Sequence, residues 1–201
     1  MKPLRTRLQE ARKRLGLPWE VLEGDYFLSW VLAGIAQVES LRDTLVFKGG
    51  TSLSKVYEAI DRFSEDVDLS FDRSALGFGG DNDPAKAPSR QQESKRLEGL
   101  SSACREMIRD WFLPQLRTAF AAALGAAPSQ ESWQLDLAQD DPDAQTLLFH
   151  YPAGVGERDG SMARYQLPVV RLELGARVRS RPAGRTWPTS GGTTSSRRSR
   201  S

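Results

Sequence analysis

The spacing of hydrophobic residues in the first third of the chain predicts helices. Residues 3–15 have a charged amphipathic pattern that we expect to end near Gly16. In residues 24–39 large apolar side chains recur at helical spacing, and Asp25 is expected to cap the start of that helix. Residues 51–61 place Leu, Val, Tyr and Ile on one face of a further helix.

Short apolar stretches bounded by turn residues predict strands in the rest of the chain. A loop is expected over residues 77–88, and residues 89–126 read as mostly helical, with Pro114 breaking or kinking the helix. Helices come first and in the middle and most strands come late, which is typical of an α+β fold. The expected strands are residues 44–50, 65–71, 133–140, 146–153 and 167–177.

The composition is that of a soluble protein of 201 residues, 39% hydrophobic and 27% charged. No apolar run approaches the roughly 20 residues of a membrane span, and the basic N-terminus lacks the apolar middle of a signal peptide. The single cysteine, Cys104, excludes an internal disulfide, favours the cytoplasm and is expected to be a small apolar side chain on a helix. The single histidine, His150, excludes histidine metal clusters and Ser/His triads and reads as an ordinary strand residue.

The basic residues are concentrated at the C-terminal end. Residues 175–201 contain seven arginines and no acid, whereas the remainder has 21 basic and 26 acidic residues, a net charge of −5. Residues 178–201 have almost no apolar content, so we expect them to be disordered. They could be an arginine-rich arm for RNA, a functionless solvated end, or the product of a reading-frame change, and the third interpretation is favoured below.

Gly49 and Gly50 separate a predicted strand from a predicted helix. Two residues without side chains let backbone N–H groups approach a ligand, and a helix N-terminus attracts anions. Thr51 and Ser52 add hydroxyl donors, so the corner suits a phosphate, although a plain tight turn has the same glycines. It is not a Walker loop, because that loop needs Gly directly before its Lys and here Lys55 follows a serine.

Two aspartates follow on the next predicted strand. Asp66 and Asp68 share one face because side chains alternate along a strand, and Val67 points into the core. Neighbouring carboxylates repel each other unless a cation lies between them, and Mg²⁺ prefers such oxygen ligands; a solvated edge strand is the alternative. Two-metal transfer chemistry usually needs a third carboxylate, and Glu173 is the candidate, on the same face of the last strand as Arg171. An ordinary surface glutamate on an amphipathic strand is the alternative.

The stretch "FKGGTSLSKVY…RFSEDVDLSF" resembles the AbiEii/AbiGii nucleotidyltransferase toxins of abortive-infection systems, a family that includes the MenT toxins and belongs to the polymerase-β-like nucleotidyltransferase superfamily. The similarity covers roughly residues 14–177. It implies a polymerase-β-like fold, a mixed sheet flanked by helices, together with a nucleoside triphosphate substrate and Mg²⁺, with two metal ions expected. The residues implied are Asp66 and Asp68 as metal ligands and catalytic residues, Glu173 as a further catalytic residue, and Gly49, Gly50, Thr51, Ser52 and Lys55 around the phosphates, with Lys48 near them.

The resemblance implies a toxin of a type IV-like toxin–antitoxin or phage-defence system that transfers a nucleotide to RNA, with the 3′ end of tRNA as the expected acceptor. A cognate antitoxin is the implied protein partner, and no membrane is involved. Two alternatives remain open: the same site nucleotidylates a protein, or the chain is an inactive truncated remnant.

The resemblance also suggests a domain division. Residues 1–177 form one nucleotidyltransferase domain, with a helical part at 1–40, a metal-binding core at 41–177 and a helical insertion at 89–126. Family members continue past this point with a helical half that supplies a lysine and an aspartate near the nucleotide. Residues 178–201 offer no match to those positions, hence the hypothesis of a frameshift or truncation.

Overall fold

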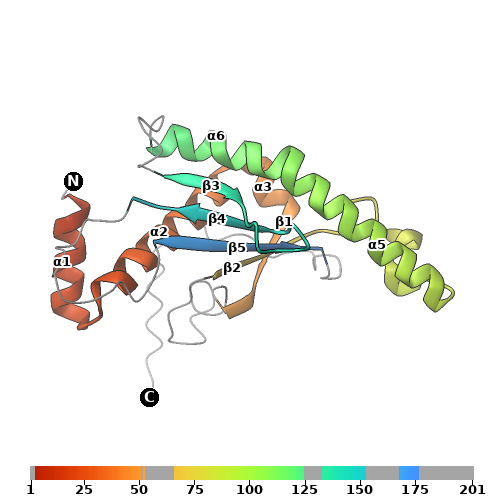
Figure 1. The fold of residues 1–201 in the computed structure, drawn as a ribbon, viewed down its shortest axis with the longest axis horizontal. Coiled ribbons are helices and arrows are strands. Elements are labelled where there is room, and N and C mark those ends of the chain that lie inside the picture. Colours follow the sequence, from red (N-terminus) through yellow and green to blue (C-terminus); the bar gives the residue numbers. More distant parts are fainter. Residues whose placement is uncertain (1–2, 51, 53–65, 125–132, 153–167, 177–201) are drawn as a thin grey trace, which may run out of the picture.

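The computed structural model describes residues 3–50, 52, 66–124, 133–152 and 168–176 (Figure 1). Its helices and five-stranded mixed sheet confirm the predicted α+β class. The helix predicted at 51–61, apart from Ser52, and the tail at 178–201 lie outside the described residues. The domain division drawn from the sequence therefore stays a prediction.

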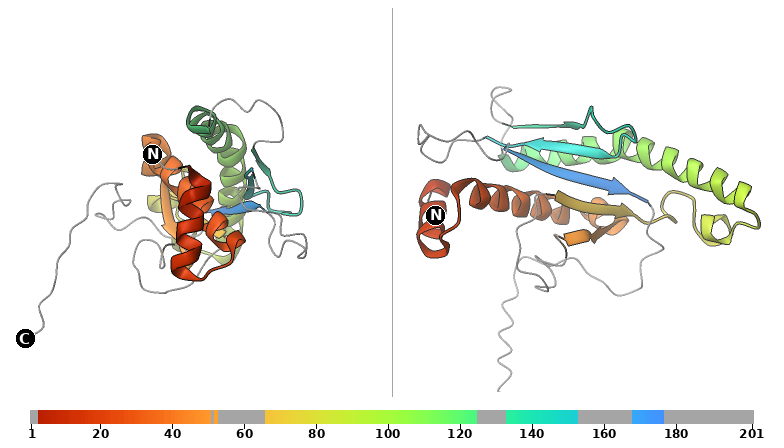
Figure 2. Two further views of the ribbon diagram at one scale, coloured as in Figure 1. Left: turned by 90° about the vertical axis from the view of Figure 1, so that its left-hand side faces the viewer. Right: turned by 60° about the horizontal axis from the view of Figure 1, so that its bottom comes forward.

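The sheet has the strand order β1-β2-β5-β4-β3. Strands β2 and β5 are parallel, and the other neighbouring pairs are antiparallel. All five predicted strands are present, and the right-hand view of Figure 2 shows α6 on the side of β4, away from β1. Their bounds are β1 Leu45–Lys48, β2 Asp66–Phe71, β3 Gln134–Leu137, β4 Thr146–His150 and β5 Val169–Gly175.

Along the chain, three described helices precede β1 and two more lie in the long connection between β2 and β3. Their bounds are α1 Leu4–Leu15, α2 Trp19–Gln37, α3 Glu39–Thr44, α5 Arg90–Met107 and α6 Leu113–Leu124, with 3₁₀ turns η1 Gly80–Asn82 and η2 Pro84–Lys86. The first predicted helix is confirmed, and Gly16 ends it in the left-handed conformation (φ 68°). Among the described helices, none is both long and apolar enough to cross a membrane.

The start of the second helix differs from the sequence prediction. Helix α2 begins at Trp19, directly after Pro18, so Asp25 lies inside the helix and the prediction that it caps the start was wrong. The first turns carry Leu22 and Glu23, both buried, and this burial against the rest of the fold outweighs the capping preference of an aspartate.

Pro114 does not end the helical run between β2 and β3. A π-helical segment, η3 Ile108–Phe112, immediately precedes α6, in which Pro114 is the second residue. Proline lacks an N–H, and its ring clashes with the carbonyl four residues earlier, so a wider turn at this point relieves the conflict. The described helical run from residue 90 to residue 124 is therefore continuous, with an altered turn in its middle.

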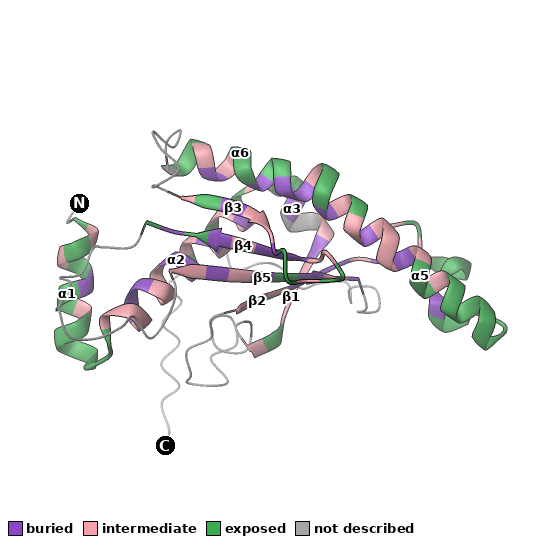
Figure 3. Cartoon of the chain, in the orientation of Figure 1, coloured by how far each residue is buried: buried purple, intermediate pink, exposed green. Residues whose placement is uncertain are grey.

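The core lies between the helices and one apolar face of the sheet. Phe149 of β4 packs against Phe27 and Trp30 of α2 and Phe120 of α6, with ring centroids 5.0–6.4 Å apart. Figure 3 shows buried positions along β4, β5 and the inner sides of α2 and α6, whereas α1 and the first turns of α5 are largely exposed. Aromatic pairs at these spacings add to the stabilisation from buried apolar area, so this face carries the main packing of the core.

Cys104 belongs to this core, as the sequence predicted. Its side chain on α5 is fully buried, and that burial raises the pKa of the thiol to about 11. The thiol is thus neutral at physiological pH and acts as a small apolar group.

The connection after β2 is held by a buried arginine. The side chain of Arg73 donates from Nε to the carbonyl of Ala176 at 3.0 Å and from Nη1 to Asp83 at 2.9 Å. The segment predicted as a plain loop is therefore pinned to the end of β5, and Arg96 of α5 adds hydrogen bonds to the carbonyls of Asp81 and Asp83. These contacts fix the spacing between the ends of the two central strands.

We predict that Arg73→Met lowers the free energy of unfolding by about 2–3 kcal/mol, because it removes one partner of a buried charge pair. Arg109→Met is the matched control: its pair with Asp110 is as short, at 2.7 Å, but both side chains are about 60% exposed, so no measurable change is expected. Urea unfolding followed by circular dichroism checks both variants. Equal stability losses would contradict the role assigned to Arg73.

Candidate active site on the polar face of the sheet

The second face of the sheet carries polar residues in register. Lys48 of β1 lies opposite Asp68 of β2, Asp68 beside Glu173 of β5, and Glu173 opposite Thr146 of β4. Directly paired residues project from the same face of a sheet. One row across four strands therefore holds a lysine, two carboxylates and a threonine.

The strand alternation predicted for β2 and β5 is confirmed. Val67 is fully buried, whereas Asp66 and Asp68 on either side of it are partly exposed. In β5, Leu172 and Leu174 are buried, whereas the side chain of Glu173 is 50% exposed and lies on the same face as Arg171. Parallel pairing of β2 with β5 thus brings the third predicted carboxylate next to the aspartate pair.

The glycine corner and the aspartate strand are in direct contact. Gly49 has φ 76°, a conformation that side-chain-bearing residues rarely adopt. A Cβ built on Gly49 would meet Oδ2 of Asp68 at 1.8 Å and its Cγ at 2.5 Å. The carboxylate of Asp68 therefore occupies the space that any side chain at position 49 would need, and it lies directly at the corner predicted to bind phosphate.

The corner itself turns from strand to helix within one residue. Strand β1 ends at Lys48, Gly49 makes the turn, and the chain is helical at Gly50 and Ser52. The hydroxyl of Ser52 is buried and donates to the carbonyl of Gly49 at 2.8 Å, so it stabilises the corner from inside. Thr51 and Lys55, the other predicted phosphate residues, lie outside the described residues.

The donor set fits a divalent cation shared with a phosphate. The carboxylate of Asp68 lies against the backbone of Gly49, in space that a side chain at position 49 would fill. Asp66 is two residues earlier on the same face of β2. In the described parts of the chain, no three His, Cys, Asp or Glu side chains form a metal-binding group by themselves. Mg²⁺ usually takes one or two protein carboxylates and completes its shell with water and substrate phosphates, so Asp66 and Asp68 are the residues that would hold it.

Thr146, which the sequence analysis missed, is the last residue of the row, on β4 next to Glu173. It is buried opposite Glu173 at the start of β4. Burial alone would raise the pKa of Asp141, but hydrogen bonds from the Thr146 side chain and from the backbone N–H groups of Gln145 and Asp143 lower it. The ionised Asp141 anchors the turn that leads into β4. A Thr at the first residue of a strand gave no signal in the sequence.

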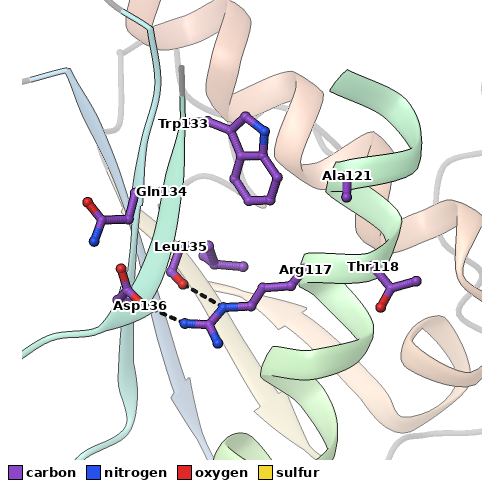
Figure 4. A pocket seen from close by; sticks show the side chains of 7 residues that line it. All are labelled: Arg117, Thr118, Ala121, Trp133, Gln134, Leu135 and Asp136. Atoms are coloured by element: carbon purple, nitrogen blue, oxygen red, sulfur yellow. Dashed lines mark hydrogen bonds and ion pairs between the residues drawn. The ribbon is translucent and has the colours of Figure 1, made fainter. Parts of the chain in front are cut away.

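A separate hollow lies at the other edge of the sheet, beside the last strand β3 (Figure 4). It has a volume of about 470 Å³ between α6 and β3. Arg117 of α6 crosses it, donating from Nε to the carbonyl of Leu135 and pairing with Asp136. Because β1 and β3 are at opposite edges, this hollow is not part of the site at Gly49. Its arginine instead covers the edge of β3, which protects an edge strand from pairing with other chains.

The chain matches one family of known proteins. A family model of nucleotidyl transferases matches residues 30–190 of the 201. The chain belongs to that family, described as the nucleotidyl transferase AbiEii toxin of type IV toxin–antitoxin systems. This membership implies a nucleoside triphosphate substrate and an antitoxin partner. The match extends beyond Arg177, where the sequence analysis expected the resemblance to end.

No curated protein and no solved structure matches the chain. The family assignment therefore depends on the family model alone.

We predict that Gly49→Ala weakens cation binding at this site at least 10-fold, since the new methyl group must displace Asp68. Gly77→Ala is the control, because Gly77 has a similar φ of 81° but open space around its Cα. Both variants should lower the free energy of unfolding by about 1 kcal/mol, because alanine is disfavoured in the left-handed backbone conformation. Titration with Mn²⁺ followed by electron paramagnetic resonance, beside thermal melting, separates the two effects. Equal Mn²⁺ affinity in both variants would contradict the prediction.

Proposed function

We propose that the protein is a Mg²⁺-dependent nucleotidyltransferase toxin that transfers a nucleotide from a nucleoside triphosphate to RNA, at the 3′ end of tRNA. The observation that supports this most strongly is the contact between Gly49 and the carboxylate of Asp68. It joins a phosphate-binding corner to a metal-binding strand, and a triphosphate–magnesium complex needs both at once.

The proposed roles follow from position. Backbone N–H groups at Gly49 and Gly50 would bind the β- and γ-phosphates at the start of the helix, with Thr51, Ser52 and Lys55 as the neighbouring residues. Asp66 and Asp68 would hold the cation. A bound Mg²⁺, or a pair of such ions, would neutralise charge on the α-phosphate and on the leaving pyrophosphate.

Glu173 is proposed to act on the acceptor. It is the next carboxylate along the row after Asp68, and its side chain is half exposed, so an incoming hydroxyl can reach it. There it would orient the hydroxyl or accept its proton as the oxygen attacks the α-phosphate. The bond from the α-phosphorus to the bridging oxygen breaks, and pyrophosphate leaves on the side of the glycine corner.

RNA is the proposed acceptor on the strength of the family. The folded body has a net negative charge, so affinity for RNA must come from local basic groups and not from a general field. Protein nucleotidylation by the same residues would use the same corner and the same carboxylates, and the experiment below separates the two acceptors.

Asp66→Asn and Asp68→Asn are each predicted to reduce transfer of label from α-³²P nucleoside triphosphates at least 100-fold, because the metal loses a charged ligand. Asp136→Asn is the matched control: a carboxylate at the far edge of the same sheet, already paired with Arg117, whose loss leaves labelling unchanged. Total bacterial RNA and cell lysate serve as acceptors with each of the four triphosphates.

Labelled product that RNase destroys and protease leaves intact identifies RNA as the acceptor, and the opposite sensitivity identifies protein. Undiminished labelling by both aspartate variants would exclude the mechanism. No labelling by the wild-type chain with any triphosphate would exclude the proposed activity.

A further inference from the structure

Arg171 lies in the middle of the polar face, beside the candidate site. In β5 it is the register partner of Asp66 on one side and lies opposite Leu148 of β4 on the other. Its side chain is 35% exposed, so most of it is shielded from water. Arg171 is two residues before Glu173 in β5, and the neighbouring strand β2 carries Asp66 and Asp68.

The guanidinium of Arg171 makes long ion pairs with two carboxylates and a hydrogen bond to neither. Its Nε is 3.6 Å from Oε1 of Glu173, and its Nη1 is 3.8 Å from Oδ2 of Asp140. Both separations exceed hydrogen-bond length. By contrast, the guanidinium of Arg109 donates to Asp110 at 2.7 and 2.8 Å. Within the described residues, the N–H groups of Arg171 have no hydrogen-bond acceptor.

Two roles are compatible with this arrangement. Arg171 could simply balance the negative charges of Asp66, Asp68 and Glu173. A cation held by Asp66 and Asp68 would take over that task for those two carboxylates, because a bound divalent ion is the largest local charge in such a site. The guanidinium of Arg171 would then be available to bind an anion. Its parallel N–H donors suit a phosphate, which accepts two hydrogen bonds from them.

The strand order indicates which phosphate this is. The glycine corner follows β1, Asp68 is on β2, and Arg171 is on β5, so the metal-binding strand lies between the corner and the arginine. Two strand spacings, about 10 Å, separate β1 from β5. In an in-line transfer the acceptor approaches opposite to the leaving pyrophosphate, which places it on the β5 side if the pyrophosphate leaves at the corner.

We propose that Arg171 binds a backbone phosphate of the acceptor RNA strand, next to the nucleotide that receives the transfer. This inference rests on the proposed function for the identity of the acceptor. A terminal nucleotide held by its neighbouring phosphate presents its hydroxyl to Glu173, because Arg171 and Glu173 are on the same face of the same strand. Arg171 is thus a substrate-binding residue and also a positioning residue for the attack.

The test is equilibrium binding of fluorescently labelled total tRNA to the full chain with Mg²⁺ present and no triphosphate, measured by anisotropy over a range of salt concentrations. Arg171→Gln should raise the Kd about 10-fold and reduce the slope of log affinity against log salt by about 1, the effect of losing one phosphate contact. Arg171→Lys should recover part of the affinity but not the full value, because it keeps the charge and loses the fork. Arg117→Gln, at the far edge of the sheet, should leave Kd and slope unchanged.

An unchanged Kd in Arg171→Gln, or no tRNA binding by the wild-type chain, would overturn the inference. A rise in Mn²⁺ affinity with unchanged RNA binding would assign Arg171 as a charge-balancing residue only. A raised KM for the triphosphate with unchanged RNA binding would assign it to the nucleotide, and this also overturns the proposal. Because the binding assay requires no turnover, it reports RNA affinity even where no label is transferred. Failure of the labelling assay is therefore distinguishable from failure here.

Discussion

The parallel pairing of β2 with β5 is the interaction on which the candidate site depends. It aligns Asp68 with Glu173, two residues far apart in the sequence, and Asp66 with Arg171. Each carboxylate alone is an ordinary strand residue, and only this register makes them neighbours. Leu69 and Leu174, paired in the same register on the other face, are both buried, so a shift of one residue would expose the apolar side of each strand. The hydrophobic core thereby fixes the spacing of the acids.

The two faces of the sheet divide the work of the molecule. Aromatic side chains of α2 and α6 cover the apolar face and hold the strands in place. The polar face leaves Glu173 half exposed and Arg171 partly so. Charged groups that must meet a substrate need a rigid backbone beneath them and water above, and a sheet with one covered face provides both. The hydrogen bond from Arg73 to the carbonyl of Ala176 joins the end of β2 to the end of β5 and so stabilises this pair of strands.

Local patterns predicted much of this arrangement, because they depend on near neighbours in the chain. The period-two alternation around Val67 and Leu172 placed the acids on one face, and all five strands were found from apolar stretches between turn residues. The start of α2 was missed because the burial of Leu22 and Glu23, which is a tertiary effect, outweighed the capping signal of Asp25. The contact of Gly49 with Asp68 and the buried hydrogen bonds of Arg73 join separate segments, and no local pattern contains them. The same is true of Thr146, whose place beside Glu173 follows only from strand pairing.

The central position of β5 has a consequence for biosynthesis. This strand lies between β2 and β4, although it is the last of the five along the chain. While a ribosome is still translating the earlier segments, β2 has no partner on that side, and its acids lack the neighbours that complete their surroundings. Strand insertion between two existing neighbours requires long-range closure, which is a slow step in folding. The nascent polypeptide therefore cannot assemble the row of Asp68 and Glu173 until β5 has left the exit tunnel, and any activity of these residues begins only after that event.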